Sequence, residues 1–374
     1  MNAERIAVLA PEIHPPFIEG VQKTAWLFIQ EFLQQQKEVF VFTEQSFGKK
    51  EILPFSLLHL NYWFTISKLK LLKYSAWARD GWRIMREVRK QKITRLYVFS
   101  LDLPFFFTLF WIFLFASDIQ VVLAIFSPRE ITFLGKMFLK IFKHKFHRYI
   151  VRSVYLQKRL LSIGVFSEKI VHILPFPNKK PFMSVTSTFQ KRARSVAYLS
   201  NAEVTAGVYD MLVLAKTLPG YEFTIAIRKF GDAEEAKVKE VEHKIREEKL
   251  LNVILKRTIE DMPTFLGETE TVILPVIDQN ASMDMPMVMI EALASKCFVI
   301  ARSIPLFQEL IQKKYVIGFH TVEELKKLVE LPFVDKKEYS ERGFGWALTL
   351  PEINVAAKLY TDLFKKNSFQ FETD

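Results

Sequence analysis

The sequence is poor in cysteine, since Cys297 is the only one among 374 residues. A single thiol excludes a disulfide framework and a cysteine-based zinc site, and it favours a reducing compartment. The strongly apolar residues 103–116 fall short of the roughly 20 residues that a membrane-spanning helix needs, so we expect a helix packed on a sheet there. No secretory signal pattern follows the first residues, and we therefore expect a cytoplasmic protein.

Glycine motifs for phosphate binding are missing as well. Neither Gly-x-x-x-x-Gly-Lys-Ser/Thr nor Gly-x-Gly-x-x-Gly occurs in the chain, which argues against phosphate-loop hydrolases and dinucleotide enzymes with that fingerprint. Zinc-hydrolase spacings are also absent, and we predict neither a metal site nor a cofactor.

Acidic residues are scarce in the first half. Residues 1–180 hold 27 of the 52 Lys and Arg residues but only 13 of the 41 Asp and Glu residues. This asymmetry is typical of a domain that approaches a polyanion, either an anionic membrane surface or a nucleic acid.

What the sequence does contain is a regular alternation of short apolar runs and amphipathic segments. This pattern predicts an α/β protein with doubly wound parallel sheets, and 374 residues suit two such domains. The rhythm is interrupted over 176–194, which we interpret as a linker. The expected strands cover 6–10, 39–42, 96–99, 121–126, 149–151 and 170–174 before the interruption, and 197–199, 223–227, 252–255, 271–275 and 298–301 after it.

The most informative segment runs from 271 to 310 as strand, polar loop and helix. Pro286 suits the first turn of that helix, and Asp284 lies where an N-cap residue is expected. The free amides and the positive end of the helix dipole would then point toward a diphosphate at the carboxyl edge of the sheet. Glu291 follows on the same helix.

Here the sequence resembles glycosyltransferase family 4. The matching residues are Pro286-Met-Val-Met-Ile-Glu291-Ala-Leu-Ala-Ser-Lys-Cys-Phe-Val-Ile300, followed by Pro305 and Glu309. The resemblance implies the GT-B fold, in which two doubly wound Rossmann-like domains face each other across a cleft that binds a nucleotide-sugar. The implied division is an acceptor-side domain over 1–178, a linker over 179–194, a donor domain over 195–350, and a C-terminal helix over 351–374 that crosses back to the first domain.

The resemblance also implies roles for individual residues of this segment. Glu291 would bind the ribose of the nucleotide, because a carboxylate accepts hydrogen bonds from two neighbouring hydroxyls. The family's second glutamate, which contacts the sugar, falls on Met283, and a one-residue slip brings Asp284 into its place. Pro286 and Met287, at the start of the helix, would line the donor.

Two further loops resemble the family's donor-binding loops. The family places an arginine and a lysine against the diphosphate, where this chain has Ser200 or Asn201 and then Ala206. The cations that follow the next two strands would replace them and stabilise the leaving group: Arg228, Lys229 and Lys256. In the first half, Glu19 and Gly20 follow the first strand like the family's Gly-Gly loop beside the donor phosphates.

Two helices of the first half carry basic stripes. The first is formed by Arg79, Arg83, Arg86 and Lys90, and the second by Lys136, Lys140 and Lys143. Neighbouring Trp and Phe side chains suit insertion at an anionic membrane surface. A solvated basic face is the alternative.

Together these features predict a glycosyltransferase that moves a sugar from a nucleotide-diphosphate donor to a glycan or lipid-linked acceptor. The resemblance implies retention of the anomeric configuration, and the protein would be cytoplasmic or peripheral at the inner membrane face. A catalytically degenerate GT-B protein that binds a glycan, a lipid headgroup or a partner enzyme is the alternative. Nucleic-acid binding by the basic half is a third reading, and we do not predict a nucleic-acid partner.

Overall fold

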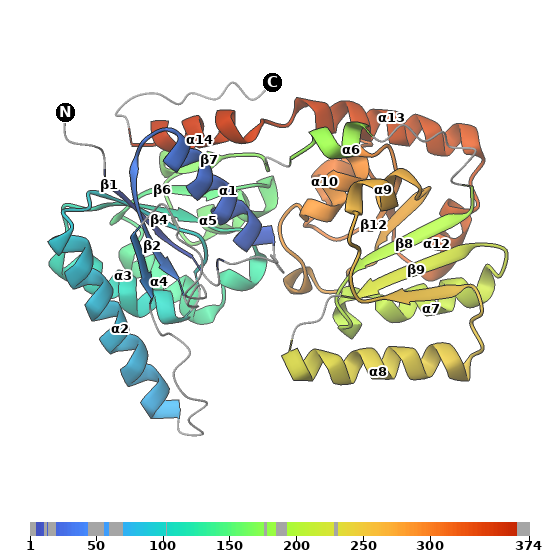
Figure 1. Ribbon diagram of the computed structural model, residues 1–374, viewed down its shortest axis with the longest axis horizontal. Helices are drawn as coiled ribbons and strands as arrows, with labels where there is room; N and C mark the ends of the chain where they lie inside the picture. Colours follow the sequence, from blue (N-terminus) through green and yellow to red (C-terminus); the bar gives the residue numbers. More distant parts are fainter. Residues whose placement is uncertain are drawn as a thin grey trace. The chain divides into compact units, whose positions relative to one another are not determined.

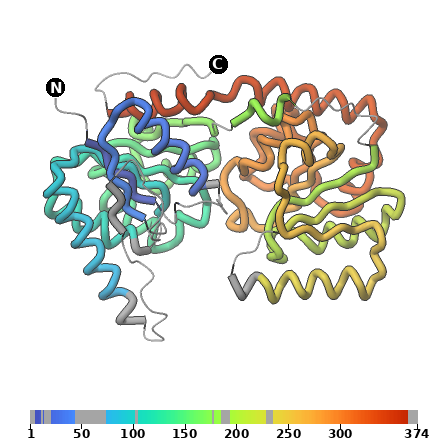
Figure 2. Tube along the Cα trace, in the orientation of Figure 1, coloured from blue at the N-terminus to red at the C-terminus, as the bar shows by residue number. Residues whose placement is uncertain are grey.

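Two compact units make up the chain. The computed structural model describes residues 5–10, 13, 20–43, 56–59, 70–101, 103–175, 178–184, 193–227 and 231–364. Unit 1 comprises residues 1–176 together with 353–374, and unit 2 comprises residues 177–352. Each unit is a parallel sheet covered by helices on both faces (Figures 1 and 2).

Within the described residues, unit 1 holds a seven-stranded sheet in the order β3-β2-β1-β4-β5-β6-β7. Each strand pair is parallel. The elements are β1 (Arg5–Leu9), α1 (Gly20–Gln34), β2 (Glu38–Thr43), β3 (Ser56–His59), α2 (Lys70–Lys90), β4 (Arg95–Val98), α3 (Leu103–Phe115), β5 (Gln120–Ala124), α4 (Phe133–Phe142), β6 (Phe146–Val151), α5 (Val154–Ser162), β7 (Ile170–His172) and α14 (Ile353–Asp362).

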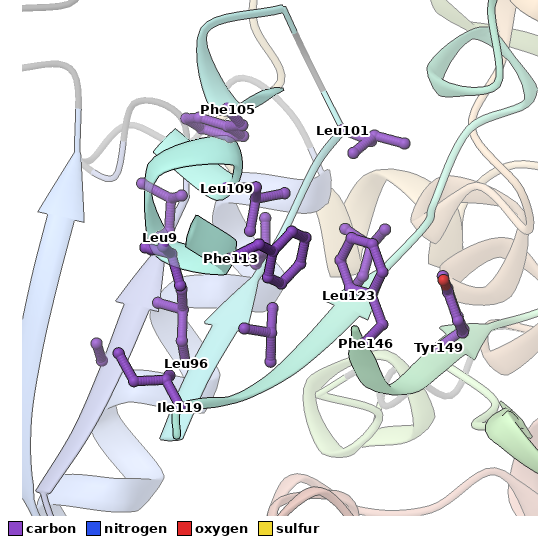
Figure 3. Close-up of a cluster of buried hydrophobic side chains, with 14 of the residues drawn as sticks. Leu9, Leu96, Leu101, Phe105, Leu109, Phe113, Ile119, Leu123, Phe146 and Tyr149 are labelled. Atoms are coloured by element: carbon purple, nitrogen blue, oxygen red, sulfur yellow. The ribbon is translucent and has the colours of Figure 1, made fainter. Parts of the chain in front are cut away.

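The sheet of unit 1 separates two apolar layers, as expected for strands that are buried on both faces. On one side, α2 to α5 pack on a core that includes Leu9, Leu96, Phe113 and Phe146 (Figure 3). The apolar stretch that we expected to pack on a sheet is α3, and it contributes Phe105, Leu109, Ile112 and Phe113 to this layer.

On the other side of the same sheet, α1 and α14 pack together. The ring of Tyr360 on α14 lies 4.6 Å from Phe28 on α1, and the Tyr97 hydroxyl donates to the Tyr360 carbonyl at 2.8 Å. Burial raises the pKa of Tyr97 well above its ordinary value, so this hydroxyl keeps its proton, and can donate, even where an exposed tyrosine would ionise. The C-terminal helix is therefore part of the core of unit 1.

Among its described residues, unit 2 holds a six-stranded parallel sheet in the order β10-β9-β8-β11-β12-β13. The elements are α6 (Lys180–Ser184), β8 (Ser195–Ser200), α7 (Val208–Thr217), β9 (Glu222–Ile227), α8 (Gly231–Glu247), β10 (Val253–Lys256), α9 (Met262–Gly267), β11 (Thr271–Leu274), α10 (Met287–Ala294), β12 (Phe298–Arg302), α11 (Gln308–Gln312), β13 (Ile317–Phe319), α12 (Val322–Val329) and α13 (Phe333–Thr349).

The strands expected from the sequence are all present, and the predicted doubly wound α/β architecture is confirmed in both units. Two strands were not expected, β3 and β13. Both are short outer strands, too short to show a clear apolar run. The segment interpreted as a linker contains the short helix α6.

Among the described helices, none combines the length and the apolarity that a bilayer span requires.

Candidate donor site

The strand order of unit 2 reverses direction between β8 and β11. In a doubly wound sheet, ligands bind outside the carboxyl ends of the strands at such a switch point. The two loops that leave these strands are residues 201–207 after β8 and residues 275–286 after β11. The candidate site therefore comprises these two loops and α10, which follows the second.

The two loops are tied together through their backbones. The amides of Ile277 and Asp278 donate to the Thr205 carbonyl at 2.8 and 3.2 Å. Gly207 has φ +85°, and a Cβ at this position would overlap the Pro275 carbonyl oxygen. Glycine is required here both for the backbone conformation and for the close approach. The switch point is thus fixed by main-chain contacts.

Arg302, the last residue of β12, also contacts the loop that follows β11, and it links this loop to α7 and to the residue after β13. Its Nε lies 3.3 Å from the Pro275 carbonyl oxygen, its Nη1 donates to the His320 carbonyl at 2.8 Å, and it forms an ion pair with Asp210 near the start of α7. The guanidinium also lies 4.7 Å from the Phe319 ring. One planar side chain with five donors can therefore join three elements.

The N-terminus of α10 faces this edge of the sheet. The amides of Met289 and Ile290 donate to the Pro286 carbonyl. Those of Met287 and Val288 belong to the first turn, where an α-helix supplies no backbone acceptor. Such a helix end attracts anions through its amides and its dipole, so α10 can receive a phosphate group.

The N-cap of α10 is Pro286, which makes no side-chain cap hydrogen bond. The prediction that Asp284 is the N-cap is therefore wrong. Asp284 is 0% exposed, and between it and the cap Met285 adopts φ +51°. This left-handed residue turns the chain, so that Asp284 lies beneath the loop and not at the helix end. A direct contact between Asp284 and a donor sugar would require the loop to open.

Glu291 lies on α10, and it is 7% exposed. Its neighbours Ile290, Ala292 and Leu293 are fully buried. A carboxylate in such surroundings is costly unless it has polar partners. Its place on the helix that starts at the switch point suits the ribose-binding role that the resemblance implies.

At the end of β8, Ser200 and Asn201 are half-buried. The Asn201 side-chain oxygen accepts from the Glu203 amide at 3.0 Å, and the Tyr198 hydroxyl donates to the Asn201 carbonyl at 2.6 Å. Asn201 thus stabilises the turn that leads to Gly207, and its side-chain amide NH₂ is the group with which it would contact a donor.

The three cations expected to stabilise the leaving group occupy different places. Lys256 ends β10, the outermost strand, and its Nζ lies 5.5 Å from the Phe265 ring. Three strand spacings separate β10 from β11, which amounts to about 14 Å. Arg228 and Lys229 follow β9, the strand beside β8, and they lie outside the described residues.

In unit 1, Gly20 is the first residue of α1, as expected, and Glu19 lies outside the described residues. Sequence reasoning missed two side chains at the carboxyl edge of this sheet. Arg152, 1% exposed, donates to the Thr24 hydroxyl of α1 at 3.0 Å and stacks 4.0 Å from the Phe126 ring. Glu130 accepts from the amides of Leu101 and Phe126, each at 3.0 Å.

These two side chains fix the loops after β4, β5 and β6. The only sequence signal for either was the Ser127-Pro128 start of a helical turn before Glu130. The links from Arg152 to Thr24 and from Glu130 to Leu101 join residues far apart in the chain, so they cannot be recognised from sequence spacing.

The comparisons with known proteins agree with this architecture. Several solved structures share the fold over nearly the whole chain. A glycosyltransferase from Rickettsia africae is 15% identical, with a TM-score of 0.73 over 98% of this chain and 100% of that one. Sucrose-phosphate synthase from Thermosynechococcus elongatus is 13% identical, with a TM-score of 0.76 over 96% and 99%. HepE from Anabaena, in complex with UDP and glucose, is 13% identical, with a TM-score of 0.74 over 97% and 99%.

The chain has the GT-B glycosyltransferase fold. No protein-family model and no curated protein matches it in sequence. At these identities the likeness establishes the GT-B fold alone.

Proposed function

We propose that this GT-B protein transfers a sugar from a nucleotide-diphosphate donor to a glycan or lipid-linked acceptor, with retention of configuration. The observation that carries the proposal is the position of Glu291 on α10, whose N-terminus lies at the switch point between β8 and β11. The carboxylate would bind the ribose while the first-turn amides bind the diphosphate. The complex of Anabaena HepE with UDP and glucose, a protein of the same fold, supports a donor of this class.

The remaining residues would divide the chemistry between them. Arg228 or Lys229, with Lys256 as the more distant choice, would neutralise charge as the nucleoside diphosphate leaves. Asp284 or the amides of its loop would orient the sugar. Gly20, with Glu19 beside it, would allow a close approach of the backbone to a phosphate. This scheme uses no metal and no cofactor. We propose that the protein acts in the cytoplasm, or peripherally at the inner face of the membrane.

A specific observation favours a second function. Residues 200–208 contain no lysine or arginine, and the one charged residue among them, Glu203, is paired with Lys237. A chain without the leaving-group cations would bind a donor, a glycan or a partner enzyme without turnover.

Isothermal titration with UDP-, GDP- and ADP-sugars, followed by mass spectrometry of products formed with a lysate lipid fraction, tests both functions. The transferase predicts binding of one donor and a product heavier by one sugar. Binding without a product would favour the second function, and no binding at millimolar concentrations would contradict the donor site itself.

A further inference from the structure

Helix α4 of unit 1 presents large apolar side chains to the outside. Phe133 is 75% exposed and Ile141 is 59% exposed, and Leu134 and Met137 are about half exposed. Phe133, Met137 and Ile141 recur every four residues, so they form one stripe along the helix. The opposite side of α4 is apolar too, because Leu139 is buried in the core. An apolar outer stripe on a surface helix requires an explanation.

The stripe continues onto α3. The Phe110 ring lies 6.2 Å from Phe142, and the Phe106 and Phe138 rings stack at 4.9 Å, so the two helices are packed together. Phe110 and Leu114, one turn apart on α3, are themselves exposed. We call the set formed by Phe110, Leu114, Phe133, Leu134, Met137 and Ile141 the α3–α4 surface.

The start of α4 is held firmly. Thr132 caps the helix by accepting from the Gly135 amide at 3.2 Å. A Cβ on Gly135 would meet the Glu130 carbonyl oxygen at 2.6 Å, and the Glu130 carboxylate is itself held by two backbone amides. These contacts fix the first turn of α4. Phe133 and Leu134 are therefore exposed in a well-defined conformation, and not because the helix end frays.

The exposed charges on the helices that form or adjoin this surface have one sign. On the described side chains of α2, α3 and α4, every exposed charged residue is basic. They are Arg79, Arg83, Arg86, Arg89, Lys90, Lys136 and Lys140. The two acidic residues among these described side chains form ion pairs with basic neighbours. Asp80 is buried beside Arg79 and Arg83, and Glu87 is paired with Lys90.

This combination identifies the class of partner. If a second copy of the chain bound the same surface symmetrically, Lys136 and Lys140 would face the same lysines of that copy, and the like charges would repel. A nucleic acid would match the charge but would not bury aliphatic side chains such as Leu134 and Ile141. A bilayer with anionic headgroups satisfies both, because apolar side chains enter the acyl boundary while the lysines remain beside the phosphates.

We propose that the α3–α4 surface docks unit 1 onto an anionic lipid bilayer. The surface belongs to unit 1 and uses none of the donor-site residues of unit 2. Binding to the bilayer requires neither donor nor acceptor.

Flotation of the full chain with vesicles tests the proposal. Vesicles of phosphatidylcholine mixed with phosphatidylglycerol are compared with vesicles of phosphatidylcholine alone. The proposal expects binding to the anionic vesicles that weakens as salt is raised. Phe133→Ser with Ile141→Ser should weaken this binding at least about tenfold, and Lys136→Gln with Lys140→Gln should remove most of the preference for anionic lipid.

The chain offers a matched control in unit 2, where Leu251 and Val334 are 97% and 73% exposed. Leu251→Ser with Val334→Ser removes a similar exposed apolar area and should leave vesicle binding unchanged. Thermal unfolding checks that each variant is folded. The proposal is overturned if the wild type ignores anionic vesicles, if the Phe133 and Ile141 variant binds as well as the wild type, or if those substitutions abolish a dimer and leave vesicle binding intact.

Discussion

Gly207 and Pro275 lie so close together that a side chain on the glycine would overlap the proline carbonyl oxygen. The two residues belong to different loops, one after β8 and one after β11. Their contact brings together the two loops between which a donor diphosphate would bind, and it requires φ +85° at Gly207. The candidate site therefore depends on the absence of a side chain as much as on the side chains present.

Replacing Gly207 by alanine should destabilise unit 2. We expect a loss of about 2–4 kcal/mol from the left-handed backbone and the overlap together, measured by urea unfolding and seen as a lower midpoint of thermal unfolding. Gly345→Ala is the control, because Gly345 lies in the interior of α13 with nothing within 4 Å of a Cβ. That substitution should stabilise by about 0.5–1 kcal/mol. Equal effects at the two positions would show that the Pro275 contact does not matter.

Glu291→Gln should weaken binding of the nucleoside diphosphate and of the nucleotide-sugar by the same factor, about ten- to a hundredfold, because the ribose is common to both. Isothermal titration with each ligand measures the two factors. Glu338→Gln, at an exposed ion pair with Arg342 on α13, serves as the control. Unchanged affinity for both ligands in Glu291→Gln would remove the ribose assignment.

Asp284→Asn should separate sugar from nucleotide. If Asp284 orients the sugar, the variant binds the nucleoside diphosphate normally and transfers sugar at least about tenfold more slowly. Because Asp284 is buried, thermal unfolding must accompany the kinetics. A variant that is destabilised but transfers sugar at the wild-type rate would instead assign Asp284 a structural role in the loop.

Among the predicted leaving-group cations, Arg228→Ala or Lys229→Ala should reduce kcat by about 10²–10³ if that residue reaches the diphosphate. Lys256→Ala should have a smaller effect, because β10 is the outermost strand of its sheet. Lys239→Ala, an exposed position on α8, is the control. The order of the three effects decides between them, and a largest effect at Lys256 would contradict the argument from strand order.

Lys336 and Glu270 form a buried ion pair at 3.3 Å, where Glu270 also accepts from the Arg194 amide. The pair lies at the amino ends of the strands, on the edge opposite the candidate site. Lys336→Met alone should cost about 3–5 kcal/mol, because it leaves a buried carboxylate without its cation. Adding Glu270→Gln should recover much of that loss. Donor affinity should not change in either variant, since the pair is remote from the site.

The same pair should give a pH dependence. Burial lowers the pKa of Lys336, and the opposing effect of Glu270 does not fully compensate. The unfolded chain then binds a proton more readily than the folded one between the lowered pKa and the ordinary value of about 10.4. Over that pH range the free energy of unfolding of the wild type should increase with pH, relative to that of the double variant Lys336→Met with Glu270→Gln. A difference that is constant with pH would contradict the lowered pKa.

The sequence by itself determined the alternation of strands and helices, because each run of apolar residues reports a buried strand locally. It therefore predicted the parallel sheets and the strand that precedes α10. It also placed Glu291 on that helix, since helical spacing and the proline at its start are local signals. The short outer strands β3 and β13 were not predicted, because three or four residues are too few to show a recognisable apolar pattern.

Only the tertiary structure decided the rest. The N-cap assignment of Asp284 failed because the backbone turns at Met285, and a left-handed residue other than glycine leaves no mark in the sequence. The links from Arg302 to Asp210 and from Lys336 to Glu270 join residues far apart in the chain, so they depend on strand order and register. The sequence predicted a basic stripe on α4 with aromatic side chains beside it, but only packing could show which apolar side chains of this helix the core would leave exposed.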